Sequence, residues 1–214
     1  MKHPWACRIA ACLALTAAGP LHAQEGFRLG AQFGMNSADA KASPLAQGIS
    51  VSVKKGWIAG LHCEYGFDSM FTLSISPRFV EKGAKLLYRD ALSETVLYNY
   101  LEAPVALRIV LRDSRLAPFI LVGFTPSLLV SARYFTEFQY GRSTQYVEAL
   151  MHTHDFSVDA GAGMQYRVVE ALLTTMSIVY AHGLVNVLLS DPGGESSEWF
   201  SRDLKIHVCV SVQL

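Results

Sequence analysis

The sequence predicts an all-β fold, an eight-stranded antiparallel up-and-down transmembrane β-barrel, and three observations support this prediction. The first is the stretch Asp155–Tyr166, where every second residue from Phe156 onward is apolar or aromatic and the residues between are small or polar. The second is that this period of two, which is typical of strands, recurs in eight segments. A tilted membrane strand needs roughly 9–11 residues. The third is that long and short connections alternate between the segments.

The composition suits a protein whose outer surface contacts lipid. Of 214 residues, 51% are hydrophobic and 17% are charged, whereas soluble domains carry roughly 25% charged residues. The formal net charge is zero, and no basic face indicates a nucleic-acid partner. Residues 117–132 are uncharged, but they include Pro118 and Pro126 and fall short of the roughly 20 residues of a membrane helix.

The N-terminus has the features of a secretory signal. Lys2 and Arg8 give a positive start, an apolar run follows at Ile9–Leu21, and a small residue ends the segment. We therefore expect residues 1–23 to be a signal peptide and residues 24–214 to form one barrel domain.

The cysteines do not indicate a disulfide or a metal site. Ile9–Cys12 imitates a lipoprotein cleavage box only loosely, because the apolar run lies after the cysteine. In the mature chain, alternation places Cys63 outward and Cys209 inward. Side chains on opposite faces of one sheet do not bridge easily, so we expect two free thiols.

Eight segments alternate well enough to be strands. They are Gly26–Met35, Trp57–Phe67, Met70–Val80, Tyr98–Leu111, Leu116–Tyr134, Asp155–Tyr166, Leu172–His182 and Arg202–Leu214.

In the first two segments, the odd-numbered residues are apolar or aromatic and form the outward face. The even-numbered residues of Gly26–Met35 are arginine, glycine and glutamine, and those of Trp57–Phe67 include histidine and glutamate. Asn36–Lys55 lies between them and is rich in Ser, Ala, Asp, Pro and Gly, so we expect a long loop. Ile49–Val53 is a candidate short strand extension within it.

The third and fourth segments continue the odd-numbered outward face. Met70–Val80 carries Thr, Ser and Arg at even positions, and we expect Pro77 near its end because proline weakens a strand ladder. Asp68 and Ser69 form the preceding tight turn. Glu81–Val96 is expected to be the second long loop. Tyr98–Leu111 then alternates aliphatic residues with polar or small ones.

In the fifth segment the even-numbered residues face outward, and Gly, Thr, Ser and Arg face inward. A short turn, Arg112–Arg115, precedes it. Phe135–Thr153 follows as the third expected long loop, with Gln, Tyr, Gly, Ser and Thr. The sixth segment is the stretch described first.

The seventh and eighth segments also place even-numbered residues outward. Leu172–His182 does so less cleanly, because Thr174 falls on the outward side. Leu184–Ser201 is the fourth expected long loop. Arg202–Leu214 alternates aliphatic residues with Lys, His, Cys, Ser and Gln.

This arrangement favours an outer-membrane barrel with short periplasmic turns and long external loops. A lipocalin-like soluble barrel places its apolar side chains inward, whereas here the inward set is small or polar, so the apolar face has to contact lipid. With eight strands the lumen is just wide enough for side chains, and we expect it to be plugged. Aromatic residues are expected at both membrane interfaces. The outer set is Trp57, Phe79, Tyr98, Tyr100, Tyr134 and Tyr180, and the inner set is Phe27, Tyr65, Phe67 and Tyr166.

Four motifs together resemble the PorT-like outer-membrane β-barrel family of Bacteroidetes. Tyr100–Leu107 is similar to its Y-L-E-hydrophobic-P strand, and Ala117–Gly123 is similar to its P-aromatic strand that ends in glycine. Asp155–Tyr166 resembles the D-F…G-x-G-x-x-Y strand, and Tyr180–Asn186 resembles the Y-x-x-G-L-x-N exit into the last loop. The resemblance covers most of the mature chain in order. It implies an eight-stranded barrel in the outer membrane of a Gram-negative bacterium.

The inward ionisable residues form the first candidate site. They are Glu64, Arg78, Glu102, Arg108, Asp159 and Arg167, with His62, Lys205 and His207 beside them. Charges removed from water need partners, so we expect a structural charge network that fills the lumen. A narrow proton or solute path and a catalytic site are the alternatives. Because Pro104 lacks an N–H group, we expect Glu102 nearby to pair with Arg108 or with an arginine of a neighbouring strand.

The third long loop supplies a second candidate site. Its aromatic residues Tyr134, Phe138, Tyr140 and Tyr146 are possible contacts for a protein partner, because exposed aromatics often anchor interfaces. A zinc site at His152, His154 and Asp155 lacks further ligand spacing, so a solvated loop is the favoured interpretation.

No G-x-S-x-G, H-E-x-x-H, Walker or dinucleotide motif is present, so we expect no cofactor. The leading hypothesis is a non-enzymatic integral outer-membrane protein that contacts lipid and acts through its external loops, in surface interaction or as an accessory to an envelope or secretion complex. One alternative is a lipid-modifying enzyme of the outer membrane. The other is a soluble periplasmic barrel that binds an apolar ligand.

Overall fold

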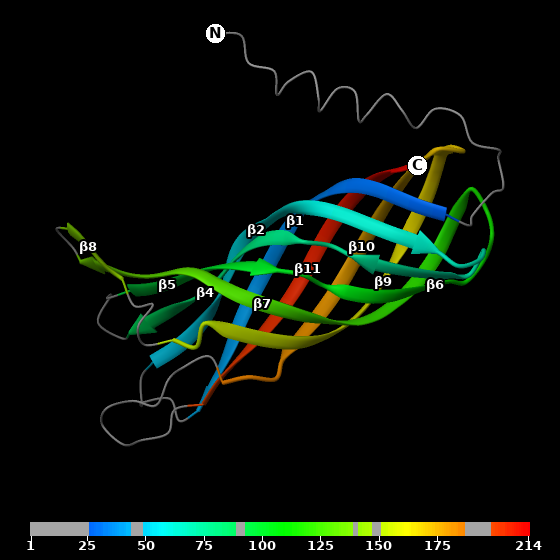
Figure 1. The fold of residues 1–214 in the computed structure, drawn as a ribbon. Helices are drawn as coiled ribbons and strands as arrows, with labels where there is room; N and C mark the ends of the chain where they lie inside the picture. Colours follow the sequence, from blue (N-terminus) through cyan, green and yellow to red (C-terminus); the bar gives the residue numbers. More distant parts are fainter. Residues whose placement is uncertain (1–25, 44–48, 89–92, 139–140, 147–150, 187–197) are drawn as a thin grey trace, which may run out of the picture.

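The computed structural model describes residues 26–43, 49–88, 93–138, 141–146, 151–186 and 198–214 (Figure 1). The expected signal peptide lies outside these residues. The regular structure in the described part of the chain is all strand, and no helix there has the length and hydropathy to cross a bilayer. The strands are β1 Gly26–Ser43, β2 Ile49–Gly66, β3 Phe71–Ile75, β4 Arg78–Tyr88, β5 Ser93–Glu102, β6 Val105–Val110, β7 Leu116–Phe138, β8 Gly141–Tyr146, β9 His154–Val169, β10 Leu172–Gly183 and β11 Glu198–Gln213.

These strands form one closed antiparallel ring of eight. β3 and β4 share one register against β2, so they form one strand interrupted at Ser76 and Pro77, and β5 and β6 form another, interrupted at Ala103 and Pro104. β8 lies outside the ring and pairs with β7, while β1 closes the ring by pairing with both β2 and β11. The predicted eight-stranded up-and-down barrel is confirmed.

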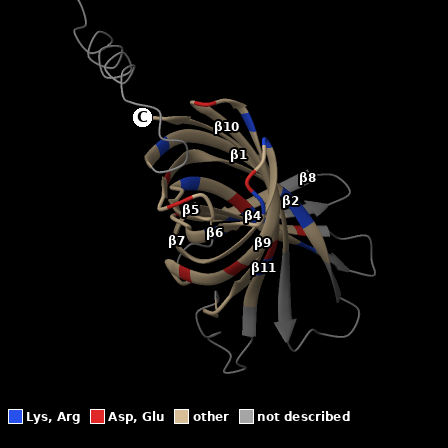
Figure 2. Ribbon diagram, turned by 90° about the vertical axis from the view of Figure 1, so that its right-hand side faces the viewer, with Lys and Arg blue, Asp and Glu red and all other residues tan. Residues whose placement is uncertain are grey.

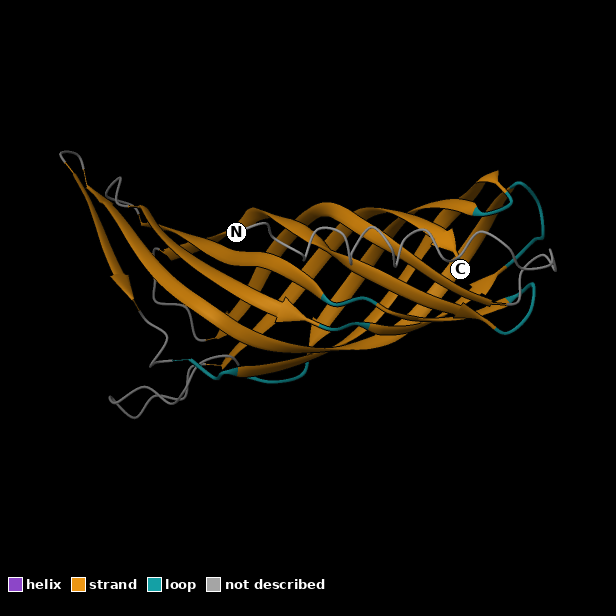
Figure 3. Cartoon of the chain, turned by 45° about the horizontal axis from the view of Figure 1, so that its top comes forward, coloured by secondary structure: helices purple, strands orange, loops and turns teal. Residues whose placement is uncertain are grey.

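The two faces of the wall follow the predicted alternation. Outward residues such as Phe33, Val122 and Val208 are exposed, and inward residues such as Gln32 and Ser211 are buried. Figure 2, which views the ring closer to its axis, shows how few strand positions carry a charge. Short turns join the strands at one end of the ring (Figure 3). By the rule for outer-membrane barrels, this is the periplasmic end.

Two of the four expected long loops are mostly strand, and here the sequence-based prediction was wrong. Asn36–Lys55 contains the end of β1 and the start of β2, and Glu81–Val96 contains the end of β4 and the start of β5. The register of β1 against β11 continues to Ser43 opposite Glu198. Small Ala and Ser side chains do not prevent pairing, and a continued ladder gives each backbone N–H and C=O group a partner.

The third expected loop also contains strand. β7 runs to Phe138, and Gly141–Tyr146 returns along it as β8, with Arg133 opposite Tyr146 and Phe138 opposite Gly141. The result is a β7–β8 hairpin that continues beyond the ring at its external end (Figure 1).

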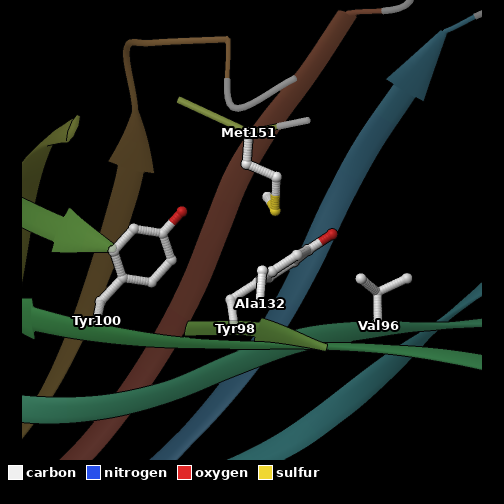
Figure 4. Packing of buried hydrophobic residues seen from close by; sticks show 5 residues of the cluster. All are labelled: Val96, Tyr98, Tyr100, Ala132 and Met151. Atoms are coloured by element: carbon white, nitrogen blue, oxygen red, sulfur yellow. The ribbon is translucent and has the colours of Figure 1, made fainter. Parts of the chain in front are cut away.

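Tyr98 and Tyr100 do not belong to an outer aromatic girdle. Alternation from Glu102 places even-numbered residues of β5 inward, and both tyrosines are buried. They form an apolar cluster with Val96, Ala132 and Met151, and the Met151 side chain points down between the two rings (Figure 4). The polar lumen therefore has an apolar layer at its external end.

Candidate functional site

A cluster of charged side chains around Glu102, here called the outer cluster, spans the lumen below the tyrosines. Its members are Arg78, Lys82, Glu102, Asp203 and Lys205. Arg78 on β4 is the register partner of Glu102 on β5, and its Nη2 atom lies 2.8 Å from Oε2. Lys205 Nζ reaches Oε2 from β11 at 2.9 Å, and Lys82 Nζ lies 2.8 Å from both Glu102 Oε1 and Asp203 Oδ2. One carboxylate thus holds three cations from two strands, β4 and β11.

A second cluster, here called the inner cluster, lies nearer the periplasmic end and centres on Glu64. Arg108 Nη2 lies 2.6 Å from Glu64 Oε2, and Arg28 Nη1 lies 3.5 Å from Oε1. His62 Nε2 lies 2.9 Å from Oε2, and His62 Nδ1 lies 2.7 Å from Ser76 Oγ. The Glu64 side chain is fully buried, while the Arg28 and His62 side chains are each 11% exposed.

Apolar layers lie beyond both clusters. Val110, Ala117 and Phe119 pack together at the periplasmic side, and the Arg108 guanidinium lies 5.3 Å from the centre of the Phe119 ring. At the external side, Lys82 Nζ lies 5.0 Å from the centre of the Tyr100 ring. These contacts join each ion cluster to the apolar layer beside it. From its external to its periplasmic end, the lumen is filled by the apolar layer of the tyrosines, the outer cluster, the inner cluster and the apolar layer around Phe119.

A small cavity of about 50 Å³ lies between the two clusters, lined by polar side chains such as Gln32, His62, Ser76 and His207 and by apolar ones such as Phe119 and Leu121. A water molecule needs at least roughly 10–15 Å³ of such space, so the cavity has room for a few waters and not for an organic substrate.

The family follows from a comparison with known proteins. A model of the outer membrane protein beta-barrel domain matches residues 22–189, more than half of the chain. The chain belongs to this family. It is therefore an integral protein of the outer membrane of a Gram-negative bacterium, and the apolar outward face of the barrel contacts lipid. The soluble periplasmic barrel considered from the sequence is accordingly wrong.

Solved outer-membrane barrels have a similar fold. OprG from Pseudomonas aeruginosa shares 12% identity with a TM-score of 0.55, over 90% of this chain and 98% of that one. Neisserial surface protein A shares 13% identity with a TM-score of 0.45, over 90% and 100%. The E. coli outer membrane protein W shares 13% identity with a TM-score of 0.44, over 91% and 100%. At 12% identity the likeness to OprG shows the fold alone. No curated protein sequence matches the chain.

The six predicted lumen residues of this barrel do not form one network. Arg78 and Glu102 belong to the outer cluster, and Glu64 and Arg108 belong to the inner one. The Asp159 carboxylate accepts hydrogen bonds from Thr125 Oγ1 and Ser157 Oγ.

Two pairing expectations need correction. Arg167 lies at the periplasmic mouth and pairs with Asp113 at 3.4 Å, because its position on β9 is too close to the turn to reach the clusters. Glu102 pairs with Arg78, an arginine of a neighbouring strand as one expectation had it, whereas Arg108 lies too far toward the periplasmic side and pairs with Glu64 instead.

Sequence reasoning did not include three members of the clusters. Lys82 was assigned to a loop, whereas Arg28 and Asp203 lie within the predicted strands Gly26–Met35 and Arg202–Leu214, at inward positions that were not among the candidate residues. The alternation that places Arg78 inward also places Lys82 inward, and this signal was available two residues past the predicted strand end.

Gln32 compensates for two proline interruptions in the barrel wall. Pro77 and Pro104 have no N–H to donate to the opposing carbonyls of Leu61 and Ser76. The Gln32 side-chain amide, on a residue only 1% exposed, donates to Leu61 O at 3.2 Å and to Ser76 O at 3.4 Å. Pro77 was expected near a strand end, but it lies in the middle of the β3–β4 strand and is tolerated because Gln32 satisfies these carbonyls.

The predicted loop contacts fall into different environments. Tyr134 packs against the buried cluster of Figure 4 and is not a free loop residue, because β7 continues through it. Phe138 ends β7, and Tyr140 lies outside the described residues. Tyr146 ends β8 with 75% of its surface exposed. Within the described part of the chain, no three His, Cys, Asp or Glu residues gather as metal ligands, His152 and His154 included. Cys63 and Cys209 are free, as predicted.

Proposed function

We propose that this outer-membrane barrel is a non-enzymatic surface-interaction protein whose binding surface is the β7–β8 hairpin. The observation that carries the proposal is that β8 lies outside the ring and, among the described residues, pairs with β7 alone. An edge strand offers backbone N–H and C=O groups to an extended segment of another chain.

The side chains of β8 support a protein partner. Ser143, Thr144, Gln145 and Tyr146 are exposed, and they combine three small or amide groups with one aromatic ring. Tyrosine often anchors protein interfaces. The filled lumen supports the same proposal. Because layers of side chains occupy the lumen, a partner outside the cell has the external strands and loops of the barrel to bind.

We further propose that the chain is a PorT-like barrel of the Bacteroidetes type. The positions of the shared motifs support this. Glu102 of the Y-L-E motif is the centre of the outer cluster, and Gly163 of the G-x-G motif lies against the Phe119 ring. An accessory role in an envelope or secretion complex is consistent with a partner-binding surface on the β7–β8 hairpin.

The test is site-specific photo-cross-linking in intact cells. A benzophenone amino acid at Tyr146 is expected to form an adduct with a protein, and the same group at Tyr180, an outward residue of the lipid-facing wall, is expected to form none. Replacing residues 138–146 by a two-residue turn should abolish the partner's co-purification. Equal adduct formation at both positions, or none at Tyr146, would refute the proposal.

A lipid-modifying hydrolase remains a second candidate because of one observation. Ser76, His62 and Glu64 are linked in the order serine, histidine, carboxylate, with Ser76 at Nδ1 and Glu64 at Nε2, the reverse of the ring nitrogens in hydrolase triads. Ser76 and His62 line the 50 Å³ cavity, and Glu64 also binds Arg108. We therefore expect a fluorophosphonate probe to leave Ser76 unlabelled in the folded barrel. Labelling that Ser76→Ala removes would favour the hydrolase.

A further inference from the structure

We propose that a pocket in the outer wall of the barrel binds the acyl chain of a single-chain amphiphile, with its carboxylate or phosphate head beside His152 and His154. The pocket has a volume of about 570 Å³, which is within the range of small-molecule sites. Its outward lining is apolar, formed by Pro77, Leu101, Ala103, Pro126, Leu128 and Phe156.

The pocket exists because the wall is weakly paired at this level. Ala103 N–H donates to Pro126 O at 3.0 Å, but Pro126 has no N–H to complete the exchange expected of an antiparallel pair. Among the described residues, the register of β9 with β7 ends at His154 opposite Leu128, with one more bond from Leu129 N–H to Thr153 O at 2.8 Å, and β7 pairs with β8 from Arg133 onward. The pocket lies at this level, here called the notch, and Pro126, Leu128 and Phe156 of β7 and β9 line it.

Membrane lipid is the medium that reaches this notch. Leu101, Leu128 and Phe156 are 49%, 45% and 36% exposed, and they continue the outward apolar band that contacts lipid. Phe156 stacks on Phe124 of that band with ring centres 5.6 Å apart. The pocket is thus continuous with the lipid interface, so an apolar chain can enter it directly from the membrane.

The polar groups at the deep end of the pocket are already satisfied. Glu102 is held by its three cations, and Asp155 accepts hydrogen bonds from its neighbour Phe156 N–H at 2.7 Å and from Ser201 Oγ at 3.1 Å. The deep end therefore presents no unpaired charge to the ligand, which fits the tail of an apolar chain.

The head of the ligand is assigned to the external edge. His152 and His154 are exposed there and line the pocket. Imidazole N–H groups donate to carboxylate and phosphate oxygens. Because the pocket has one apolar compartment, we assign it to one chain.

The experiment uses the full barrel in phosphatidylcholine vesicles with a palmitic acid that carries a photoreactive diazirine near its chain end. Cross-links mapped by mass spectrometry should concentrate at Leu101, Leu128 and Phe156, and excess unlabelled palmitic acid should suppress them. Ala103→Trp, which fills the pocket, should lower their yield at least tenfold. The matched control is Ala31→Trp, an outward alanine on β1, and it should leave the yield unchanged.

Each other outcome overturns the proposal. Cross-links spread evenly over the outward band, or not suppressed by competitor, would show ordinary lipid contact. An unchanged yield in a folded Ala103→Trp barrel, with folding checked by heat-modifiable gel migration, would exclude the pocket. If Ala103→Trp does not fold, competition on the unaltered protein decides. Exchanging palmitic acid for hexadecanol tests the head, because the preference for the acid should disappear in His152→Ala/His154→Ala.

Discussion

Each of the two ion clusters of the lumen centres on one buried glutamate, but the clusters differ in how that carboxylate is shared. Glu102 binds cations from β4 and β11 across the lumen, and every side chain of its cluster is at most 4% exposed. Glu64 binds residues of β1, β2 and β6, and two of its partners, Arg28 and His62, retain some exposure. The outer cluster is therefore a set of buried ion pairs that links β4 and β5 to β11 across the lumen. The inner cluster, in contrast, keeps some contact with water at the periplasmic mouth.

Glu102→Gln is expected to have the largest effect, because it leaves Arg78, Lys82 and Lys205 buried with one remaining carboxylate, Asp203. Removing one partner of a buried ion pair costs about 3–5 kcal/mol. The free energy of unfolding, measured by urea titration in phospholipid vesicles, should fall by this amount, and the heat-modifiable band on a gel should be lost at a lower temperature.

The matched control for this change is Glu170→Gln, which lies in the exposed turn between β9 and β10. It should leave the unfolding free energy unchanged. If Glu102→Gln behaves like this control, the outer cluster does not brace the barrel.

Glu64→Gln is expected to have a smaller effect. The change removes a charged hydrogen-bond acceptor from Arg108 and Arg28, but Arg28 can turn toward water at the mouth. We expect a loss of roughly 2–3 kcal/mol, in the range for hydrogen bonds to charged groups. The comparison of the clusters fails if the same urea titration gives Glu64→Gln an equal or larger loss than Glu102→Gln.

Gln32→Leu tests whether a side-chain amide substitutes for the missing proline N–H groups. It should cost about 1–2 kcal/mol, because Leu61 O and Ser76 O lose their donor. Pro104→Ala restores an N–H opposite Ser76, so Gln32→Leu should cost less in that background. A double-mutant cycle of unfolding free energies measures the coupling, and a coupling of zero would rule out the compensation.

The alternation of side chains was enough to predict the ring and the inward carboxylates. Glu64 and Glu102 were identified because lipid on one side and a narrow lumen on the other force apolar and polar residues onto opposite faces. The same rule placed Cys63 and Cys209 correctly. Whether a side chain points inward or outward depends only on its position along one strand, and the alternation in the sequence shows this directly.

The partners of these residues depend on pairs of strands, and alternation does not specify them. Lys205 reaches Glu102 across the lumen, 103 positions away in the chain, and no local pattern fixes that distance. The ends of the strands were also missed, because pairing above the membrane requires only a backbone partner and tolerates the Ala and Ser of β1. Tyr98 and Tyr100 were placed outward from their residue type, although their parity with Glu102 indicated the lumen.

Of these substitutions, Arg167→Ala is expected to lower the free energy of unfolding least. Arg167 pairs with Asp113 at 3.4 Å, and the Asp113 side chain is 58% exposed. Such solvated pairs contribute only about 0.2–1 kcal/mol, and salt screens them. The difference in unfolding free energy between Arg167→Ala and the unaltered barrel should shrink further when the urea titration is repeated in 0.5 M salt. A loss comparable to that of Glu64→Gln would mean that Arg167 belongs to the inner cluster after all, and that the water-accessible end of the lumen is braced as firmly as its centre.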